Sequence, residues 1–238
     1  MTETDYYVQQ KKKLLKNFDR AFGRIQKLLA KTCGDDFAAA VTAETRREYE
    51  RLIPALPYIG GSKNFYTPII IVNGWIIALF RVMRARGKTA EETVKICVDV
   101  LDEMFRGRLR FLFPLMRWAA FSRFFRRMLK KQAAQSQRRL YPGDFVYTLE
   151  EGDGEPFDFA VVFSECAVNK LYEAQGVEEL KPYCNFFDIL SGHYAGLGVT
   201  ADETIGLGCE RCVLSYKRGG ETKIVPSLAT VMSAHILE

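Results

Sequence analysis

The sequence lacks the features that mark exported, membrane-spanning and disordered proteins. Its first residues, "MTETDYYVQQKKKLL", are acidic and then basic with no apolar core, so we expect no signal peptide. The longest apolar run, residues 68–80, is short for a bilayer span and contains Asn73 and Gly74, which favours a buried helix. Hydrophobic residues make up 48% of the 238-residue chain and charged residues 26%, so we expect one large or two small globular domains.

Histidine and tryptophan are scarce, with two of each, and no second CxxC pair accompanies Cys209 and Cys212. The zinc-ribbon pattern is therefore not met. Six cysteines without an export signal favour reduced thiols in a cytoplasmic protein, because disulfide frameworks mostly stabilise much smaller secreted domains. We interpret His193, one of the two histidines, as a hydrogen-bonded structural residue.

Acidic residues are absent from residues 106–139, which hold eleven lysines and arginines and many aromatic residues. Subtracting these charges from the net charge of +5 leaves −6 for the rest of the chain. The segment suits a core helix edged by arginines, an interfacial membrane helix or a nucleic-acid surface, and its arginines could also hold an anionic ligand. Helical spacing favours the core helix, with these apolar residues packed inward: Phe121, Phe124, Phe125, Met128 and Leu129.

Hydrophobic periodicity predicts helices over residues 6–31, 36–52, 68–83, 90–105 and 115–135, the fourth opened by a capping box at Thr89 and Glu92. Alternation on both sides of "EGDGEP" predicts two strands, and residues 199–225 predict a further hairpin. Short helices are expected over residues 166–174 and 181–197.

The predicted fold class is α+β, with a helical N-terminal half followed by a C-terminal antiparallel sheet with short helices. We expect residues 1–140 to form the helical region and residues 141–238 the α+β region that carries the site. A single integrated domain is the alternative.

Cysteines and one carboxylate form the candidate site. Cys184 and Asp188 are four residues apart, so they would share one face of a helix. Cys166 precedes a predicted helix, whose N-terminus would stabilise a thiolate. A buried structural thiol is the ordinary state of any one cysteine. A zinc site is a further interpretation, and its ligands would be Cys166, Cys184, Cys209 and Cys212.

In chain order these features resemble a family pattern: a strand, a cysteine, a short helix with a glycine, C-x-x-x-D, and a strand T-L-x-x-G-G-x-x-C-D-F. The matching residues are Cys166, Gly176, Cys184, Asp188, Thr204, Gly208 and Cys212, and "LPYIGGSKN" at residues 56–64 is a further similar segment. The chain thus resembles the L-2-amino-thiazoline-4-carboxylic acid hydrolase family over most of its length. It departs from the pattern at Cys209, Val213 and Ala201, so the resemblance implies no contact with a substrate carboxylate there.

The resemblance implies hydrolysis of a carbon–nitrogen bond in a small cyclic amidine, which yields a carbamoyl-cysteine. Such chemistry needs a nucleophile, a general acid or base, and a cationic group for the substrate carboxylate. Our hypothesis assigns Cys166 or Cys184 as nucleophile, Asp188 as base or orienting group, and Cys212 as a wall of the site or a ligand. Glu165 is a second candidate acid or base.

A non-catalytic protein that binds or senses a small molecule on the same scaffold is the alternative function, and a thiol or zinc protein is a third. We expect an anionic small-molecule partner and no nucleic acid, with a membrane surface ranked below the small molecule. The sequence identifies no cofactor-binding residue and leaves the metal, the cofactor and homo-oligomerisation open.

Overall fold

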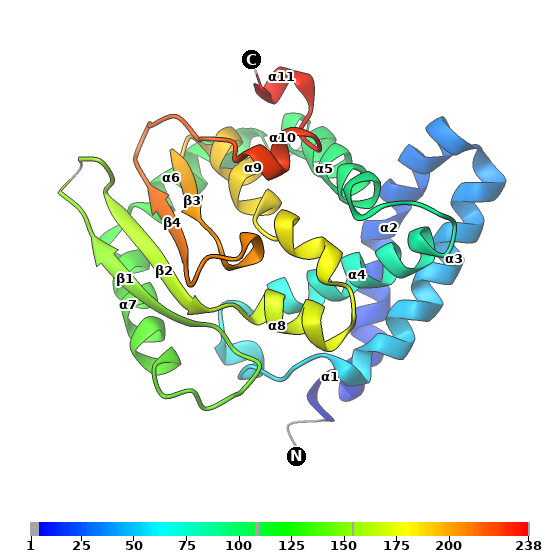
Figure 1. The fold of residues 1–238 in the computed structure, drawn as a ribbon, viewed down its shortest axis with the longest axis horizontal. Coiled ribbons are helices and arrows are strands. Elements are labelled where there is room, and N and C mark those ends of the chain that lie inside the picture. Colours follow the sequence, from blue (N-terminus) through cyan, green and yellow to red (C-terminus); the bar gives the residue numbers. More distant parts are fainter. Residues whose placement is uncertain (1–4, 108–109, 154, 238) are drawn as a thin grey trace.

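A four-stranded antiparallel sheet presents one face to a layer of helices. The structure is a computed structural model that describes residues 5–107, 110–153 and 155–237. The strands are β1 (Val146–Glu151), β2 (Phe159–Glu165), β3 (Val199–Glu203) and β4 (Cys212–Tyr216). Their order in the sheet is β1-β2-β4-β3, and every neighbouring pair is antiparallel. The predicted α+β class is confirmed, with a helical N-terminal half followed by the sheet and short helices (Figure 1).

Helices account for most of the first half and connect the strands of the second. The first half contains α1 (Tyr6–Gln9), α2 (Lys11–Cys33), α3 (Asp35–Leu52), α4 (Thr67–Arg84), α5 (Ala90–Arg106), α6 (Phe113–Ala120) and α7 (Arg123–Ser136). The second half contains α8 (Ala167–Ala174), α9 (Phe186–Ala195), α10 (Pro226–Ala229) and α11 (Ala234–Leu237). Short 3-10 turns are η2 (Ile53–Ala55), η3 (Gly61–Lys63), η4 (Arg110–Leu112), η5 (Glu178–Tyr183) and η6 (Ile205–Leu207).

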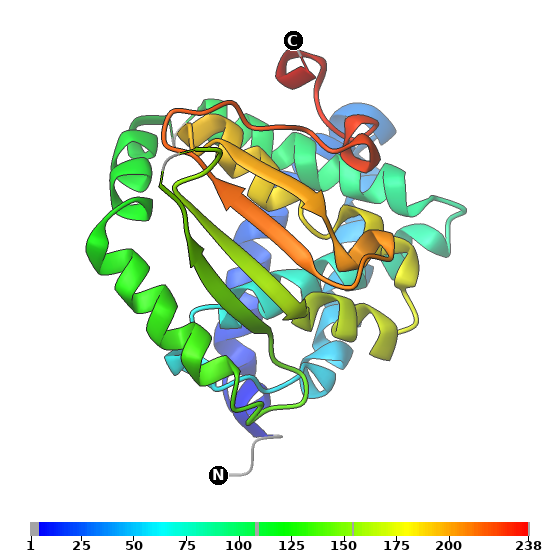
Figure 2. The ribbon, with the colours of Figure 1, turned by 60° about the vertical axis from the view of Figure 1, so that its left-hand side comes forward.

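Hydrophobic side chains at every second position of the strands form the buried face of the sheet. Phe159, Val161 and Phe163 alternate along β2 and are all buried. Their partners on β4 are Tyr216, Leu214 and Cys212. Because directly opposite residues of an antiparallel pair lie on the same face, Cys212 points with Phe163 toward the helices. The other face carries exposed residues such as Thr148 and Ser164, and Figure 2 shows the helices behind the sheet.

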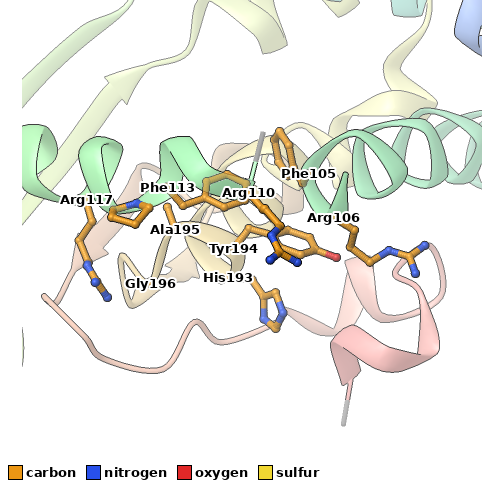
Figure 3. Close-up of a pocket in the computed structure, with 10 residues that line it drawn as sticks. Phe105, Arg106, Arg110, Phe113, Arg117, His193, Tyr194, Ala195 and Gly196 are labelled. Carbon is orange, nitrogen blue, oxygen red and sulfur yellow. The ribbon is translucent and has the colours of Figure 1, made fainter. Parts of the chain in front are cut away.

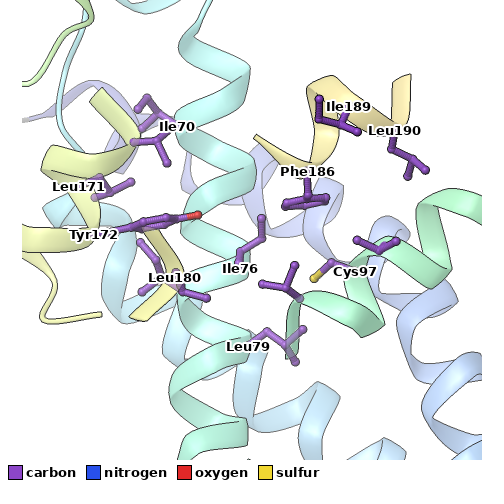
Figure 4. Packing of buried hydrophobic residues seen from close by; sticks show 14 of the residues in the cluster. Ile70, Ile76, Leu79, Cys97, Leu171, Tyr172, Leu180, Phe186, Ile189 and Leu190 are labelled. Atoms are coloured by element: carbon purple, nitrogen blue, oxygen red, sulfur yellow. The ribbon is translucent and has the colours of Figure 1, made fainter. Parts of the chain in front are cut away.

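Helix α4 lies at the centre of the helical layer. It is the one helix in the described part of the chain that is long and apolar enough to cross a membrane, yet 61% of it is buried inside the protein. Gly74 permits close packing, since a Cβ there would lie 3.0 Å from Leu56 Cδ2. Side chains from α4, α5, α8 and α9 meet in one cluster (Figure 4). The expectation of a buried helix is therefore confirmed.

A buried hydrogen bond attaches α8 to α4. Tyr172 OH donates to Asn73 Oδ1 at 2.5 Å, and Asn73 Nδ2 donates to the Ile69 carbonyl at 2.9 Å. Burial raises the pKa of the Tyr172 phenol well above its ordinary value, so the phenol remains a donor. Helix α8 begins directly after Cys166, and Tyr172 lies in its last turn, so this bond attaches the far end of the helix that follows Cys166 to α4.

Three predicted helices are divided in the structure, whereas the capping box of Thr89 and Glu92 is confirmed. The helix expected over residues 6–31 breaks at Gln10. The one expected over 115–135 ends at Ala120, and Ser122 Oγ then caps α7 by accepting the Phe125 N–H at 3.1 Å. The one expected over 181–197 is split into η5 and α9, so Cys184 and Asp188 do not share a helix.

The core-helix interpretation of the basic segment is wrong for part of its aromatic residues. Phe121 and Leu129 are buried, and Phe125 and Met128 are partly buried. In contrast, Phe124 is 81% exposed. The break between α6 and α7 separates these residues into two helices, so one continuous buried stripe does not form.

We expect Tyr172→Phe to lower the free energy of unfolding by about 1–3 kcal/mol, because it leaves the buried Asn73 oxygen without its donor. Urea denaturation of both proteins measures this difference. Tyr183→Phe is the matched control, since its hydroxyl makes only an exposed 3.5 Å contact with Glu91. Equal stabilities of the two variants would contradict the structural role of the Tyr172 bond.

Candidate functional site

Four predicted site residues lie near one another at one end of the sheet: Cys166, Cys184, Asp188 and Cys212, called here the Cys–Asp cluster. Antiparallel pairing explains part of this, because Cys212 at the start of β4 lies opposite Phe163, close to the end of β2 and so to Cys166. Cys184 follows η5 directly, and Asp188 lies in the first turn of α9. The pKa of the Cys184 thiol is raised by burial and then by Cys166, Cys212 and Asp188, which places all four within electrostatic range.

Asp188 has the most unusual electrostatics of the cluster. Burial raises the pKa of its carboxyl from 3.8 to about 6, and only its own backbone amide opposes this. No cationic side chain among the described residues is paired with it, yet the residue retains some solvent exposure. A carboxyl that titrates near neutrality and is not held in an ion pair is suited to general acid–base catalysis.

The thiols of the cluster are protonated at neutral pH. Burial raises the pKa of Cys212 to about 11, although the Ile205 N–H donates to its Sγ at 3.0 Å. Burial also raises the pKa of Cys166, while the amides of Asn169 and Val168 lower it in part. The predicted thiolate at Cys166 is therefore wrong, because burial outweighs the helix N-terminus. A thiolate forms there only if a neighbouring base accepts its proton.

Two buried amide groups beside the cluster lack partners. Asn169, in the first turn of α8, is 3% exposed, and Asn185, next to Cys184, is 6% exposed. Among the described residues nothing hydrogen-bonds to Asn169 Oδ1 or Asn185 Nδ2. The other Asn169 atom, Nδ2, lies 4.0 Å from Cys184 Sγ. Buried polar groups are almost always satisfied, so each of these two atoms is missing one expected hydrogen-bond partner.

Sequence reasoning missed these asparagines and also Gly206. A Cβ at Gly206 would lie 2.2 Å from the Lys181 carbonyl and 3.1 Å from Cys184 Sγ, so only glycine lets η6 pass this closely. Asn185 lies inside the "CNFFD" segment already singled out, and its polarity between apolar neighbours was the available signal. Asn169 has no comparable signal, because a polar residue in a short helix is usually exposed.

Glu165 lies outside the cluster although it adjoins Cys166 in sequence. Its carboxylate accepts hydrogen bonds from Lys170 Nζ and, at 2.7 Å, from Arg139 Nε. These two cations, Lys170 first, lower the pKa of Glu165. A carboxylate held in this way has little capacity to accept or release a proton near neutral pH, so the structure gives no support to an acid or base role.

The zinc interpretation is not supported. Cys209 is exposed, whereas Cys212 is buried on the helix-facing side of β4. Over residues 5–107, 110–153 and 155–237 no group of three or more histidine, cysteine or acidic side chains is arranged to hold a metal ion. Cys209 therefore does not join the three clustered thiols.

A pocket of about 520 Å³, called here the arginine pocket, lies at the opposite end of α9 from Asp188 (Figure 3). Its walls come from α5, η4, α6 and the last turn of α9, and no cluster residue lines it. The lining side chains include Phe105, Arg106, Arg110, Phe113, Arg117, His193 and Tyr194. Phe113 and Tyr194 stack with ring centroids 5.7 Å apart and form an aromatic wall.

The pocket carries an excess of positive charge. Arg106 is paired with the buried Asp102 at 2.9 Å, and Tyr194 OH also donates to that carboxylate. Arg110 and Arg117 have no acidic partner in the described part of the chain. These two guanidinium groups are therefore free to pair with an anionic ligand.

His193 lines this pocket, and the interpretation as a hydrogen-bonded structural residue is wrong. Its ring meets Tyr194 edge-on at 5.2 Å and makes no hydrogen bond with a described residue. Burial, followed by the nearby His235, lowers the pKa of His193. The ring is therefore mainly neutral at pH 7 and available to a ligand.

Comparison with known proteins adds no assignment: no family model matches the chain, and no significantly similar curated protein or solved structure is found. The resemblance to the thiazoline-carboxylate hydrolases therefore stays a prediction.

We expect Asp188→Asn to be more stable than the natural protein at pH 7.5 by up to about 3 kcal/mol, because it removes a buried charge. The folded pKa of Asp188 lies above the unfolded value, so its stabilising contribution is full below pH 3.8 and is lost as pH rises through about 6. The difference should therefore vanish at pH 3.5. Thermal unfolding at both pH values measures it.

Glu165→Gln provides a control of opposite sign. The folded pKa of Glu165 is lowered, so its stabilising contribution exists at neutral pH and disappears as pH falls. This variant should lose up to about 1 kcal/mol at pH 7.5. A loss of stability in Asp188→Asn at pH 7.5 would contradict the desolvated state of that carboxyl.

Proposed function

We propose that the protein hydrolyses a small cyclic amidine of the 2-aminothiazoline-4-carboxylate type at the Cys–Asp cluster, by opening the ring carbon–nitrogen bond. The observation that supports this most strongly is the Asp188 carboxyl, with a pKa of about 6, gathered with three cysteines. The resemblance of the sequence to the thiazoline-carboxylate hydrolases agrees with it. The proposal requires that a small ligand reach the partly exposed residues Cys166, Cys184 and Asp188.

In the proposed reaction Asp188 transfers two protons, one in each step. In the first step its carboxylate accepts a proton from water as the water oxygen bonds to the ring carbon between sulfur and nitrogen, and it passes that proton to the ring nitrogen. In the second step it accepts the proton of the new hydroxyl group as the carbonyl forms, the bond from the carbon to the ring nitrogen breaks, and Asp188 gives this second proton to the departing nitrogen. The product is a carbamoyl-cysteine that carries the carbamoyl group on sulfur, and one water is consumed. A pKa of about 6 suits both transfers near neutral pH.

The neighbouring side chains would orient the amidine. Asn169 Oδ1, which has no partner, would accept a hydrogen bond from the exocyclic amino group, and Asn185 Nδ2 would donate to the substrate carboxylate or the developing oxyanion. A covalent route through Cys166 is the variant of this mechanism in which Asp188 takes the thiol proton. Cys166 suits it better than Cys184, because more amide donors lower its pKa.

We expect the purified protein to turn over 2-aminothiazoline-4-carboxylate, and Asp188→Asn to lower kcat at least about 100-fold, as removal of a general base does. Chromatographic detection of carbamoyl-cysteine measures the rate. Cys166→Ser distinguishes the two routes: activity within about threefold indicates direct attack by water, and loss comparable to Asp188→Asn indicates a covalent intermediate.

Glu165→Gln and Cys209→Ala are the matched controls, because Glu165 is fixed by Lys170 and Arg139 and Cys209 is exposed outside the cluster. Both should retain activity within about twofold, an effect typical of surface substitutions. Turnover that survives Asp188→Asn would remove the proposed role of the cluster.

A non-catalytic binding or sensing protein is the second candidate, and the arginine pocket favours it. Arg110 and Arg117 line a pocket of about 520 Å³ with aromatic walls, which suits a small planar anion. Two substitutions separate the candidates when binding of 2-aminothiazoline-4-carboxylate is measured by calorimetry. If the hydrolase proposal holds, Arg110→Gln leaves the affinity of the protein for 2-aminothiazoline-4-carboxylate unchanged. Binding without turnover that is lost in Arg110→Gln and kept in Asp188→Asn would favour the sensing protein.

A further inference from the structure

The surface of η4, α6 and the start of α7 exposes an unusual concentration of large apolar side chains. The exposed fractions are Phe111 73%, Leu112 36%, Leu115 61%, Met116 41%, Trp118 69% and Phe124 81%. Single exposed hydrophobic residues are normal on a protein surface, but a contiguous group marks an interaction site. These six residues, called here the apolar patch, all fall within residues 111–124.

Helix α6 is oriented with its apolar side toward solvent. Leu115 and Trp118 are three positions apart in α6 and share one face, Phe111 lies in the η4 turn that leads into the helix, and all three are exposed. The opposite side of the same segment carries Phe113 and Arg117, which line the arginine pocket. An amphipathic helix of a water-soluble protein normally buries its apolar side, so this arrangement is the reverse of the usual one.

Positive charge surrounds the apolar patch. Arg110, Arg117, Arg123 and Arg127 are exposed, and no acidic side chain in the described part of the chain pairs with them. The sequence has no acidic residue anywhere in the range 106–139. The partner of this surface therefore combines an apolar interior with negative charge at its boundary.

We propose that η4, α6 and the start of α7 form a peripheral membrane-binding surface that docks on a bilayer containing anionic lipids. Exposed aromatic and aliphatic side chains would enter the boundary between headgroups and acyl chains, while the arginines contact anionic headgroups. Figure 2 shows α6 and α7, drawn in green, along one margin of the molecule. This inference does not depend on the hydrolase proposal.

Two other occupants fit the patch less well. A second copy of the chain related by a twofold axis would bring identical surfaces together and place the arginines of both copies close to one another. A nucleic acid would pair with the arginines but would leave the aliphatic side chains of Leu115 and Met116 facing phosphates. A bilayer accepts both kinds of side chain.

Cosedimentation of the full chain with vesicles tests the proposal. We expect strong binding to phosphatidylcholine vesicles that contain about one third phosphatidylserine, and at least about tenfold weaker binding to phosphatidylcholine alone. High salt should weaken the binding. The fluorescence of Trp118 should shift to shorter wavelength on binding, and this shift should be absent in Trp118→Ser, which keeps Trp75.

The double substitution Leu115→Ser and Trp118→Ser should reduce vesicle binding at least about fivefold, because it removes apolar side chains that enter the bilayer. Leu207→Ser is the matched control, since Leu207 is 49% exposed in η6, away from α6, and should bind as the natural protein does. Circular dichroism and thermal unfolding of each variant verify that the fold is retained.

Three results would overturn the proposal: no sedimentation with anionic vesicles, binding that the double substitution leaves unchanged, or an equal loss in Leu207→Ser. Analytical ultracentrifugation tests for a second copy of the chain on the apolar patch, and retention on single-stranded RNA tests for a nucleic acid. Dimerisation or RNA binding that depends on Leu115 and Trp118, without vesicle binding, would assign the apolar patch to that partner instead.

Discussion

Desolvation of the Asp188 carboxyl is the constraint on which the account of this protein depends. The packing of α9 against the sheet raises the pKa of this group to about 6 and leaves it without a cation among the described residues. A protein tolerates such a group at a cost in stability, and groups of this kind concentrate at functional sites. The same burial keeps the neighbouring thiols protonated, so the proton chemistry of the cluster centres on Asp188 rather than on a cysteine thiolate.

The fold holds the cluster by contacts that are distant in sequence. Pairing of β2 with β4 brings Cys212 beside the end of the strand that precedes Cys166. The buried bond from Tyr172 to Asn73 then fixes α8 on the core helix α4. Helix α9 connects the two sites, because Asp188 lies in its first turn and His193 lines the pocket near its end. A ligand in the arginine pocket would thus contact the same helix that positions the carboxyl.

Local sequence patterns predicted the fold class well, since periodicity and turn residues act over a few positions. The capping box at Thr89 and the strands flanking "EGDGEP" are examples. The sequence suggested that the cluster residues lie close together, with Cys184 and Asp188 on one face of a single helix. In the structure these two residues instead lie on either side of a break between η5 and α9. Depth of burial decides whether Cys166 is a thiol or a thiolate, and no local pattern reports it. The inward packing predicted for Phe124 was wrong because the spacing of apolar residues indicates a face without indicating what covers it.

The most direct measurement of this account is the titration of Asp188 itself. Nuclear magnetic resonance of the carboxyl carbon, assigned by comparison with Asp188→Asn, gives its pKa in the folded protein. We expect a midpoint near 6, well above the ordinary 3.8, as a desolvated carboxyl without a cationic partner requires. A midpoint at or below 3.8 would show a solvated or ion-paired carboxylate, and the cluster would then lose its capacity for proton transfer near neutral pH.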